Sequence, residues 1–211
     1  MNMQNVHIIN HPLVQHKISL MRDANTGSKE FRELVSETAM LMCYEATEDL
    51  PLKEVEIKTP QQYTKSKVIS GCKMALVPIL RGGLAMTDGI SKLIPTIKIG
   101  HVGVFRDRET GETVKYYSKF PADIDERNVI IVDTMLATGG AAITTAKELV
   151  EAGVKNIKFM CLIASPEGLQ ALTTAYPDIE IYCCAIDKGL DENGYIVPGL
   201  GDAGNRIFGT K

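Results

Sequence analysis

The chain of 211 residues carries 23 lysines and arginines against 26 aspartates and glutamates, which leaves a net charge of −3. The length suits one domain with a full hydrophobic core, and the lack of a basic run argues against nucleic acid as the main partner. The longest apolar run, from Met74 to Leu80, is too short to span a membrane, and the N-terminus lacks the regions of a signal peptide. We therefore expect a cytoplasmic protein without a membrane partner.

Two amphipathic helices are expected first. Pro12 lies near the first position of a helix that runs to about Arg22. Ser28 is placed to cap a second helix, whose apolar residues keep helical spacing as far as Met42. The pair packs either on the core or against another subunit. The polar stretch from Thr47 to Lys67 then indicates an edge hairpin or an irregular hood.

The next unit is a strand, a glycine turn and a helix. The strand is Met74 to Leu80, the turn is Arg81-Gly82-Gly83, and the helix runs from Leu84 to Leu93. A fixed positive side chain beside a helix N-terminus favours an anion there. The alternative is an exposed arginine beside glycines that serve only the turn.

A charged hairpin follows another strand. Ile97 to Phe105 forms the strand, interrupted by glycines, and Arg106 comes directly after it. The turn-rich segment from Asp107 to Phe120 predicts a protruding hairpin with Arg106 at its root. Such a hairpin is either a mobile lid over phosphates or a solvated surface feature.

The chain is organised around the segment from Val129 to Ala141. Its first four residues are aliphatic without alternation, which predicts a strand buried on both faces, ended by Asp133. Thr138-Gly139-Gly140 leads into a helix from Ala141 to Glu151, so backbone N–H groups can cradle a phosphate beside a carboxylate that binds sugar hydroxyls. No P-loop or dinucleotide motif is present, which favours a ribose 5-phosphate. The alternative is a tight turn in which Asp133 helps to cap the helix.

Later segments keep the alternation of strands and helices. A strand from Ile157 to Ala164, a helix from Pro166 to Ala175 and a strand from Ile179 to Ile186, ending at Asp187, are expected. This order predicts an α/β fold with a mainly parallel sheet flanked by helices. The tail from Gly194 to Gly209 is rich in glycine but keeps apolar residues, so it is pinned to the domain rather than disordered.

Cysteine and histidine spacing argues against a zinc site. There is no Cys-x-x-Cys pair, and three of the five cysteines lie in apolar, strand-like segments. We expect all five to be core residues: Cys43, Cys72, Cys161, Cys183 and Cys184.

Three motifs together resemble the uracil phosphoribosyltransferase family: Pro78–Leu84, Val132–Gly140 and Tyr195–Gly204. The similarity extends from His11 to the C-terminus, and the last motif is the most specific. The resemblance implies a type I phosphoribosyltransferase fold that converts uracil and phosphoribosyl pyrophosphate (PRPP) into UMP and pyrophosphate, with Mg2+ bound mainly through PRPP. It also implies one domain over 1–211, with N-terminal helices at 11–50, a core at about 68–188 and a uracil-binding hood at about 189–211.

The resemblance further implies the site residues. Catalytic roles fall to Asp133, Asp202 and Arg106, and Asp202 is a candidate for easing loss of the uracil N1 proton. The residues expected to bind PRPP are Arg81, Arg106, Asp133, Thr134, Met135, Leu136, Ala137, Thr138, Gly139, Gly140, Ala141 and Asp202. The residues expected to bind uracil are Ile196, Gly201, Asp202 and Ala203. The resemblance also implies assembly into a homodimer or homotetramer, and GTP as a candidate activator.

Three positions depart from the family pattern. The family usually has proline at Thr134, serine at Ala141 and often alanine at Gly83. Loss of the serine hydroxyl could weaken PRPP binding by about 0.5 to 1.5 kcal/mol.

Two other classes of function stay open: a regulatory RNA-binding protein on the same scaffold, and a non-catalytic nucleotide-binding domain.

Overall fold

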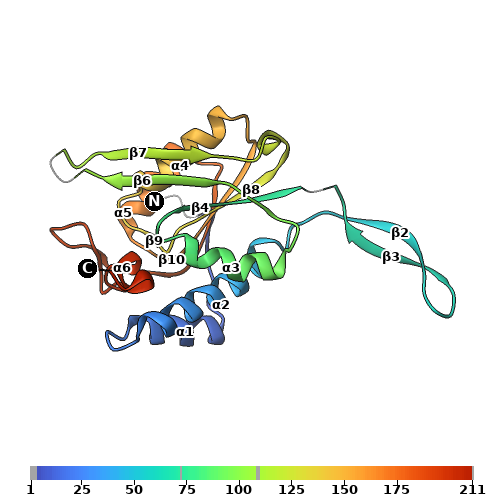
Figure 1. Cartoon of the computed structure of the whole chain (residues 1–211), viewed down its shortest axis with the longest axis horizontal. Coiled ribbons are helices and arrows are strands. Elements are labelled where there is room, and N and C mark those ends of the chain that lie inside the picture. The colour runs from blue at the N-terminus through green and yellow to red at the C-terminus, as the bar shows by residue number, and fades with distance from the viewer. Residues whose placement is uncertain (1–3, 72, 108–109, 211) are drawn as a thin grey trace.

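The computed structural model describes residues 4–71, 73–107 and 110–210. The strands of its main sheet are β1 (Val6–Ile8), β4 (Met74–Leu80), β5 (Lys98–Ile99), β6 (His101–Arg106), β7 (Thr113–Lys119), β8 (Asn128–Val132), β9 (Met135–Leu136), β10 (Asn156–Ala164) and β11 (Glu180–Ile186). They follow the order β1-β11-β10-β8-β4-β6-β7, with β5 beside β4 and β9 beside β10. All of these pairs are parallel except β6–β7. Figure 1 shows this sheet at the centre of the molecule.

Helices cover both faces of the sheet. One buried cluster joins the sheet to α1 (Pro12–Arg22), α2 (Ser28–Ala46), α3 (Leu84–Leu93) and α6 (Ala203–Phe208). The opposite cluster joins it to α4 (Gly140–Glu151) and α5 (Pro166–Ala175). In β8, Ile130 and Val132 belong to the first cluster, whereas Val129 and Ile131 belong to the second. The predicted α/β fold and the fully buried central strand are therefore confirmed, because both faces of β8 need apolar side chains.

Most predicted elements form within one or two residues of their expected bounds, but some details differ. Ser28 begins α2 instead of capping it, since the extended residue before it is Gly27, which offers no side chain. The strand predicted from Ile97 divides at Gly100, where an added Cβ atom would lie 3.0 Å from the carbonyl oxygen of Lys119. The three-residue edge strand β1 was not predicted, because it is too short to show a period.

The polar stretch after α2 forms a hairpin of its own. Strands β2 (Leu52–Lys58) and β3 (Tyr63–Ile69) pair only with each other, and Figure 1 shows them extending away from the body. Of the two alternatives, a hairpin is therefore right, but it does not lie on the edge of the main sheet. No helix in the described ranges is long and apolar enough to cross a membrane.

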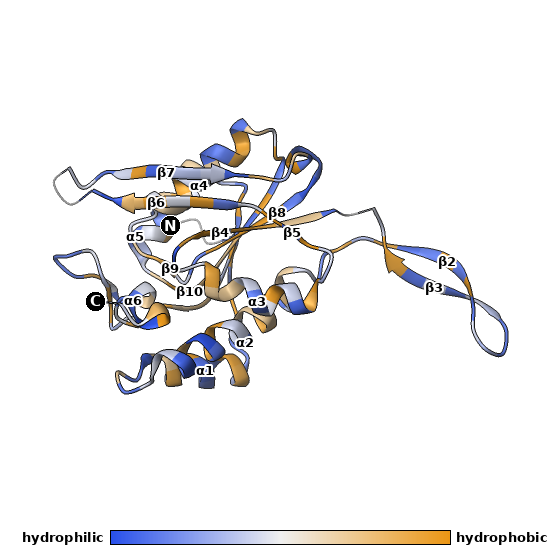
Figure 2. Ribbon diagram, in the orientation of Figure 1, coloured by the Kyte–Doolittle hydropathy of each residue, from blue (hydrophilic) through white to orange (hydrophobic). Residues whose placement is uncertain are grey.

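The second hairpin, β6–β7, is the antiparallel edge of the main sheet. Its residues are more polar than those of β4, as Figure 2 shows. Arg106 pairs with Thr113 next to the turn, so it lies near the tip of the hairpin and not at the predicted root. The Nζ atom of Lys115 lies 2.5 Å from Oε1 of Glu148, which ties β7 to α4. Arg108 and Glu109, part of the predicted hairpin, lie outside the described residues.

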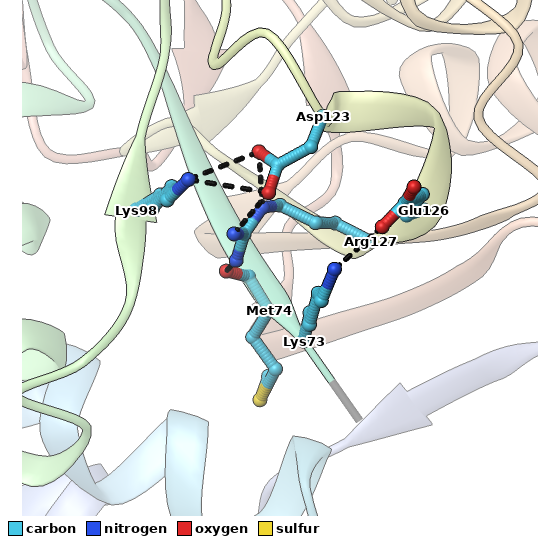
Figure 3. Close-up of polar contacts among 6 residues, drawn as sticks. All are labelled: Lys73, Met74, Lys98, Asp123, Glu126 and Arg127. Carbon is cyan, nitrogen blue, oxygen red and sulfur yellow. Dashed lines mark hydrogen bonds and ion pairs between the residues drawn. The ribbon is translucent and has the colours of Figure 1, made fainter. Parts of the chain in front are cut away.

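A charged cluster fixes the amino end of the sheet (Figure 3). Arg127, only 8% exposed, donates two hydrogen bonds to Asp123, at 2.9 and 2.7 Å, and one to the carbonyl oxygen of Met74 at 3.0 Å. The bonds from Arg127, with a further one from Lys98, hold the pKa of Asp123 well below its usual range. The cluster ties the short 3-10 helix η1 (Ile124–Glu126) and its flanks to the start of β4.

The described cysteines agree with the expected core positions. Cys43, Cys161, Cys183 and Cys184 are buried with free thiols, and burial raises the pKa of Cys43 to about 11. Cys72 lies outside the described residues.

Candidate functional site

The two predicted glycine turns meet at the carboxyl edge of the sheet. Strands β4 and β8 are paired neighbours, so the turns that follow them lie side by side. A Cβ atom added at Gly82 would lie 2.7 Å from Oδ1 of Asp133 and 2.8 Å from Oγ1 of Thr134. Only a glycine allows this close approach, and it places the turn that carries Arg81 directly beside Asp133.

Asp133 has a carboxyl group whose pKa lies near neutral pH. The residue is half-buried, and its Oδ1 accepts a hydrogen bond from the backbone N–H of Thr134 at 2.7 Å. Desolvation outweighs this bond and raises the pKa of Asp133 to about 7. A cation or sugar hydroxyls at this position would favour the charged form. A raised pKa in a cavity is typical of functional carboxylates.

The loop after Asp133 forms a small cavity at the N-terminus of α4. Gly139 has φ 85°, and a Cβ atom there would lie 2.9 Å from the Cβ of Ala171. The cavity has a volume of ≈ 270 Å³ and is lined by 133–139, 141, 142 and Phe159, together with Gly82 and Gly204. The first N–H groups of a helix lack intrahelical partners and carry partial positive charge, so an anionic group fits here.

The two arginines lie outside this cavity. Arg81 is exposed, and its guanidinium carbon is 5.5 Å from the ring centroid of Phe208 in α6. Arg106 is also exposed, and a Cβ atom at Gly194 would lie 2.6 Å from its NH1. Arg106 lines a second, open cavity of ≈ 860 Å³ with Thr138 and residues 190–195. Thr138 lines both cavities, so the two adjoin.

A buried ion pair holds the glycine-rich tail. Arg22 donates to Oδ1 and Oδ2 of Asp187 at 2.6 and 2.8 Å, and to the carbonyl oxygen of Gly199 at 2.9 Å. The N–H of Gly199 donates to Oδ2 of Asp187 at 2.9 Å. Burial opposes the charge of Asp187, but the bonds from Arg22 and Gly199 prevail and lower its pKa. The middle of the tail is thus fixed to the ends of α1 and β11.

The rest of the tail is also ordered by specific contacts. It contains β13 (Ile196–Val197) and α6, and β13 pairs with β12 (Gly189–Leu190) just before the tail; none of these was predicted as an element. Arg206 donates to the carbonyl oxygens of Met21, Leu200 and Asp23 and lies 4.3 Å from the ring centroid of Phe31.

The expected uracil-binding residues lie on this ordered segment. The side chains of Ile196 and Ala203 are buried, whereas Gly201 is exposed and has φ 71°. Asp202 caps α6, because its Oδ1 accepts a hydrogen bond from the N–H of Asn205 at 2.8 Å. Arg81 comes close to this helix, since its NH2 would lie 4.0 Å from a Cβ atom at Gly204.

One of the departures from the family pattern, Gly83, has a local explanation. A Cβ atom at Gly83 would lie 2.3 Å from the carbonyl oxygen of Val132, so alanine would require the backbone here to shift. Thr134 is 2% exposed, and its hydroxyl lies 3.5 Å from Oδ1 of Asp133. Ala141 offers no hydroxyl to the cavity.

Sequence reasoning missed the residues that hold the site from a distance. Two of them, Arg22 and Arg206, belong to no motif, and Asp187 was noted only as the end of a strand. Its position at the carboxyl end of a parallel strand was the one available signal.

Known proteins share both sequence and fold with this chain. The family model for uracil phosphoribosyltransferase matches residues 8–210. A uracil phosphoribosyltransferase of Thermoanaerobacter sp. (strain X514) is 60% identical over 208 residues, which cover 99% of each chain.

Two solved structures extend the comparison to the fold. The AQ2163 protein from Aquifex aeolicus has a TM-score of 0.91 at 33% identity, over 96% of this chain and 97% of that one. An adenine phosphoribosyl transferase from Trypanosoma brucei, at 12% identity, has a TM-score of 0.58 over 90% of this chain and 87% of that one, which shows a shared fold. The chain belongs to the uracil phosphoribosyltransferase family, a group of pentosyltransferases with the type I phosphoribosyltransferase fold.

Proposed function

We propose that the chain transfers the phosphoribosyl group of PRPP to N1 of uracil, giving UMP and pyrophosphate in pyrimidine salvage. The observation that carries the proposal is the arrangement at the carboxyl edge of the sheet. There, a carboxylate and a helix N-terminus share one cavity that adjoins a second cavity beside the tail.

In this proposal each part of the substrates has its own partner. The 5-phosphate lies in the cradle formed by 138–141, and the ribose hydroxyls contact Asp133 while 134–137 line the pocket. Pyrophosphate is held by Arg81, which lies near α6, and by Arg106, which lies near Gly194. The hood at about 189–211 holds uracil through Ile196 and Gly201–Ala203, and Asp202 also reaches PRPP.

The chemistry requires stabilisation of two opposite charges. Cleavage of the bond from C1′ to pyrophosphate develops positive charge on the ribose, which the ionised carboxylate of Asp133 stabilises. Negative charge develops on the leaving group, and Arg81 and Arg106 stabilise it. Uracil N1 attacks C1′ directly, so no covalent nucleophile is required, and Asp202 is the candidate for easing loss of the N1 proton.

The donor set fits a magnesium ion that arrives with PRPP. Among the described residues, no three His, Cys, Asp or Glu side chains are grouped so that they could hold a metal. Mg2+ often keeps waters and substrate oxygens with only one or two carboxylates, a role that Asp133 would fill. When bound, the ion would neutralise charge on the pyrophosphate.

We further propose a homodimer or homotetramer in the cytoplasm. Large apolar side chains on the β2–β3 hairpin are exposed, including Leu52 at 57%, Tyr63 at 64% and Ile69 at 54%, and burial in a subunit contact would remove them from water. Activation by GTP stays a prediction.

A product assay tests the proposal. Labelled uracil, PRPP and Mg2+ should give UMP and pyrophosphate in equal amounts, and omission of PRPP should abolish both. Folded protein that forms no UMP under saturating substrates would contradict the proposed function.

A further inference from the structure

A hydroxyl group from the β6–β7 hairpin lies at the start of α4. A Cβ atom added at Gly140 would be 2.3 Å from Oγ1 and 3.4 Å from Cβ of Thr113, and 3.8 Å from Oγ1 of Thr138. A side chain at position 140 would therefore require the Thr113 hydroxyl to move. The two threonine hydroxyls, one from the hairpin and one from the loop, flank the same helix N-terminus.

The position of Thr113 is fixed by regular structure. It is the first residue of β7 and pairs with Arg106 in the ladder of the hairpin. Two residues further along, the ion pair between Lys115 and Glu148 fastens β7 to α4. Thr113 is half-buried, and its hydroxyl forms no hydrogen bond with the described part of the chain, which leaves its donor unused.

We propose that Thr113 is a further substrate-binding residue, whose hydroxyl donates a hydrogen bond to the 5-phosphate in the cradle at the N-terminus of α4. This inference rests on the proposed function, in which that cradle takes the 5-phosphate of PRPP and UMP. Because Ala141 has no hydroxyl, Thr113 supplies a second hydroxyl donor beside that of Thr138. Because Thr113 and Arg106 are paired across the hairpin, Thr113 then lies at the phosphate while Arg106 lies toward the tail.

A pair of substitutions separates the hydroxyl from the shape of the side chain. Thr113→Val keeps the β-branched shape that suits a strand and removes the donor, whereas Thr113→Ser keeps the donor. We expect Thr113→Val to raise the Kd of UMP and the KM of PRPP about tenfold, which corresponds to about 1.4 kcal/mol. Thr113→Ser should stay within about threefold of the wild type. Thr64→Val, on β3 of the remote hairpin, is the matched control and should change neither value.

Pyrophosphate provides the selective readout, because it has no 5-phosphate. Its inhibition constant should be unchanged in Thr113→Val. An unchanged Kd for UMP would overturn the role of Thr113. Equal weakening of UMP and pyrophosphate binding would also overturn it, because that result would mean only that Arg106 has shifted. Wild-type protein that neither binds nor forms UMP would instead overturn the proposed function.

Discussion

Replacement of Asp187 by asparagine tests whether the ion pair beneath the tail controls recognition of the base. The carboxylate accepts two bonds from Arg22 and one from Gly199, and Asp187 is 9% exposed. Removing one partner of a buried pair costs about 3 to 5 kcal/mol. The side chain of Arg22 is 27% exposed, so water compensates in part and we expect about 2 to 3 kcal/mol.

This loss should appear as a looser tail as well as a lower melting temperature. We expect Asp187→Asn to raise the KM of uracil at least about tenfold and to raise the KM of PRPP less, because the phosphate cradle belongs to other elements and only Asp202 of the tail reaches PRPP. The Tm should fall by roughly 5 to 10 °C. Since the pKa of Asp187 is lowered, the charge is present throughout the neutral range and the effect should not depend on pH there.

The cluster at the other end of the sheet offers the control for this variant. Asp123→Asn also breaks a two-bond pair with an arginine, but Asp123 and Arg127 lie at the amino ends of the strands (Figure 3). It should lower the Tm and leave the KM of uracil unchanged. If both variants gave the same uracil KM, the ion pair beneath the tail would have only a structural role.

The remaining predictions concern the reacting groups and the hairpin. Asp133→Asn should lower kcat at least about tenfold, since an amide stabilises positive charge poorly; near-normal turnover would refute this role. Burial raises the pKa of Asp133 from 3.8 to about 7 in the folded protein, so the wild type loses stability as the pH rises from about 4 to 7. The Tm of Asp133→Asn relative to the wild type should therefore rise between about pH 4 and 7 and level off above that range. A difference constant with pH would contradict the raised pKa. The tail should accept 5-fluorouracil, which keeps the hydrogen-bonding edge of uracil, and reject cytosine by at least about 10³ in kcat/KM; cytosine turnover within tenfold would exclude backbone reading. PRPP with Mg2+ should protect 107–120 from protease if the hairpin is a lid, whereas unchanged cleavage would indicate a passive hairpin.

The sequence predicted the parts of the fold whose signals are local. The strand ending at Asp133 was recognisable because both of its faces are buried, which leaves a run of aliphatic residues. Helices α3 and α5 begin and end at the predicted residues, since glycine, serine and proline mark their first turns. The arrangement of 133–141 around a cavity follows from the same unit of strand, loop and helix.

The contacts that the sequence could not predict join distant positions. Arg22 and Asp187 are 165 residues apart, and Arg206 meets the carbonyl oxygen of Met21 across 185 residues. Neither arginine belongs to a motif, and the carbonyl groups that they bind leave no trace in composition. Thr113 was hidden for a related reason: its role depends on the β6–β7 register, which places Arg106 opposite it near the tip.

The N-terminal helices α1 and α2 support the site. Their amphipathic pattern alone could not decide whether they pack on the core or against another subunit. Their apolar faces belong to the buried cluster beneath the sheet, so the pair packs on the core. Their polar residues then reach the tail, because Arg32 in α2 donates to the carbonyl oxygen of Ile207 at 2.7 Å, while Arg22 at the end of α1 binds Gly199 and Asp187. A loop rich in glycine loses much conformational entropy when it is ordered. These arginine contacts offset that loss of entropy before any ligand binds. The peptide groups proposed to read uracil are therefore already arranged when the base arrives.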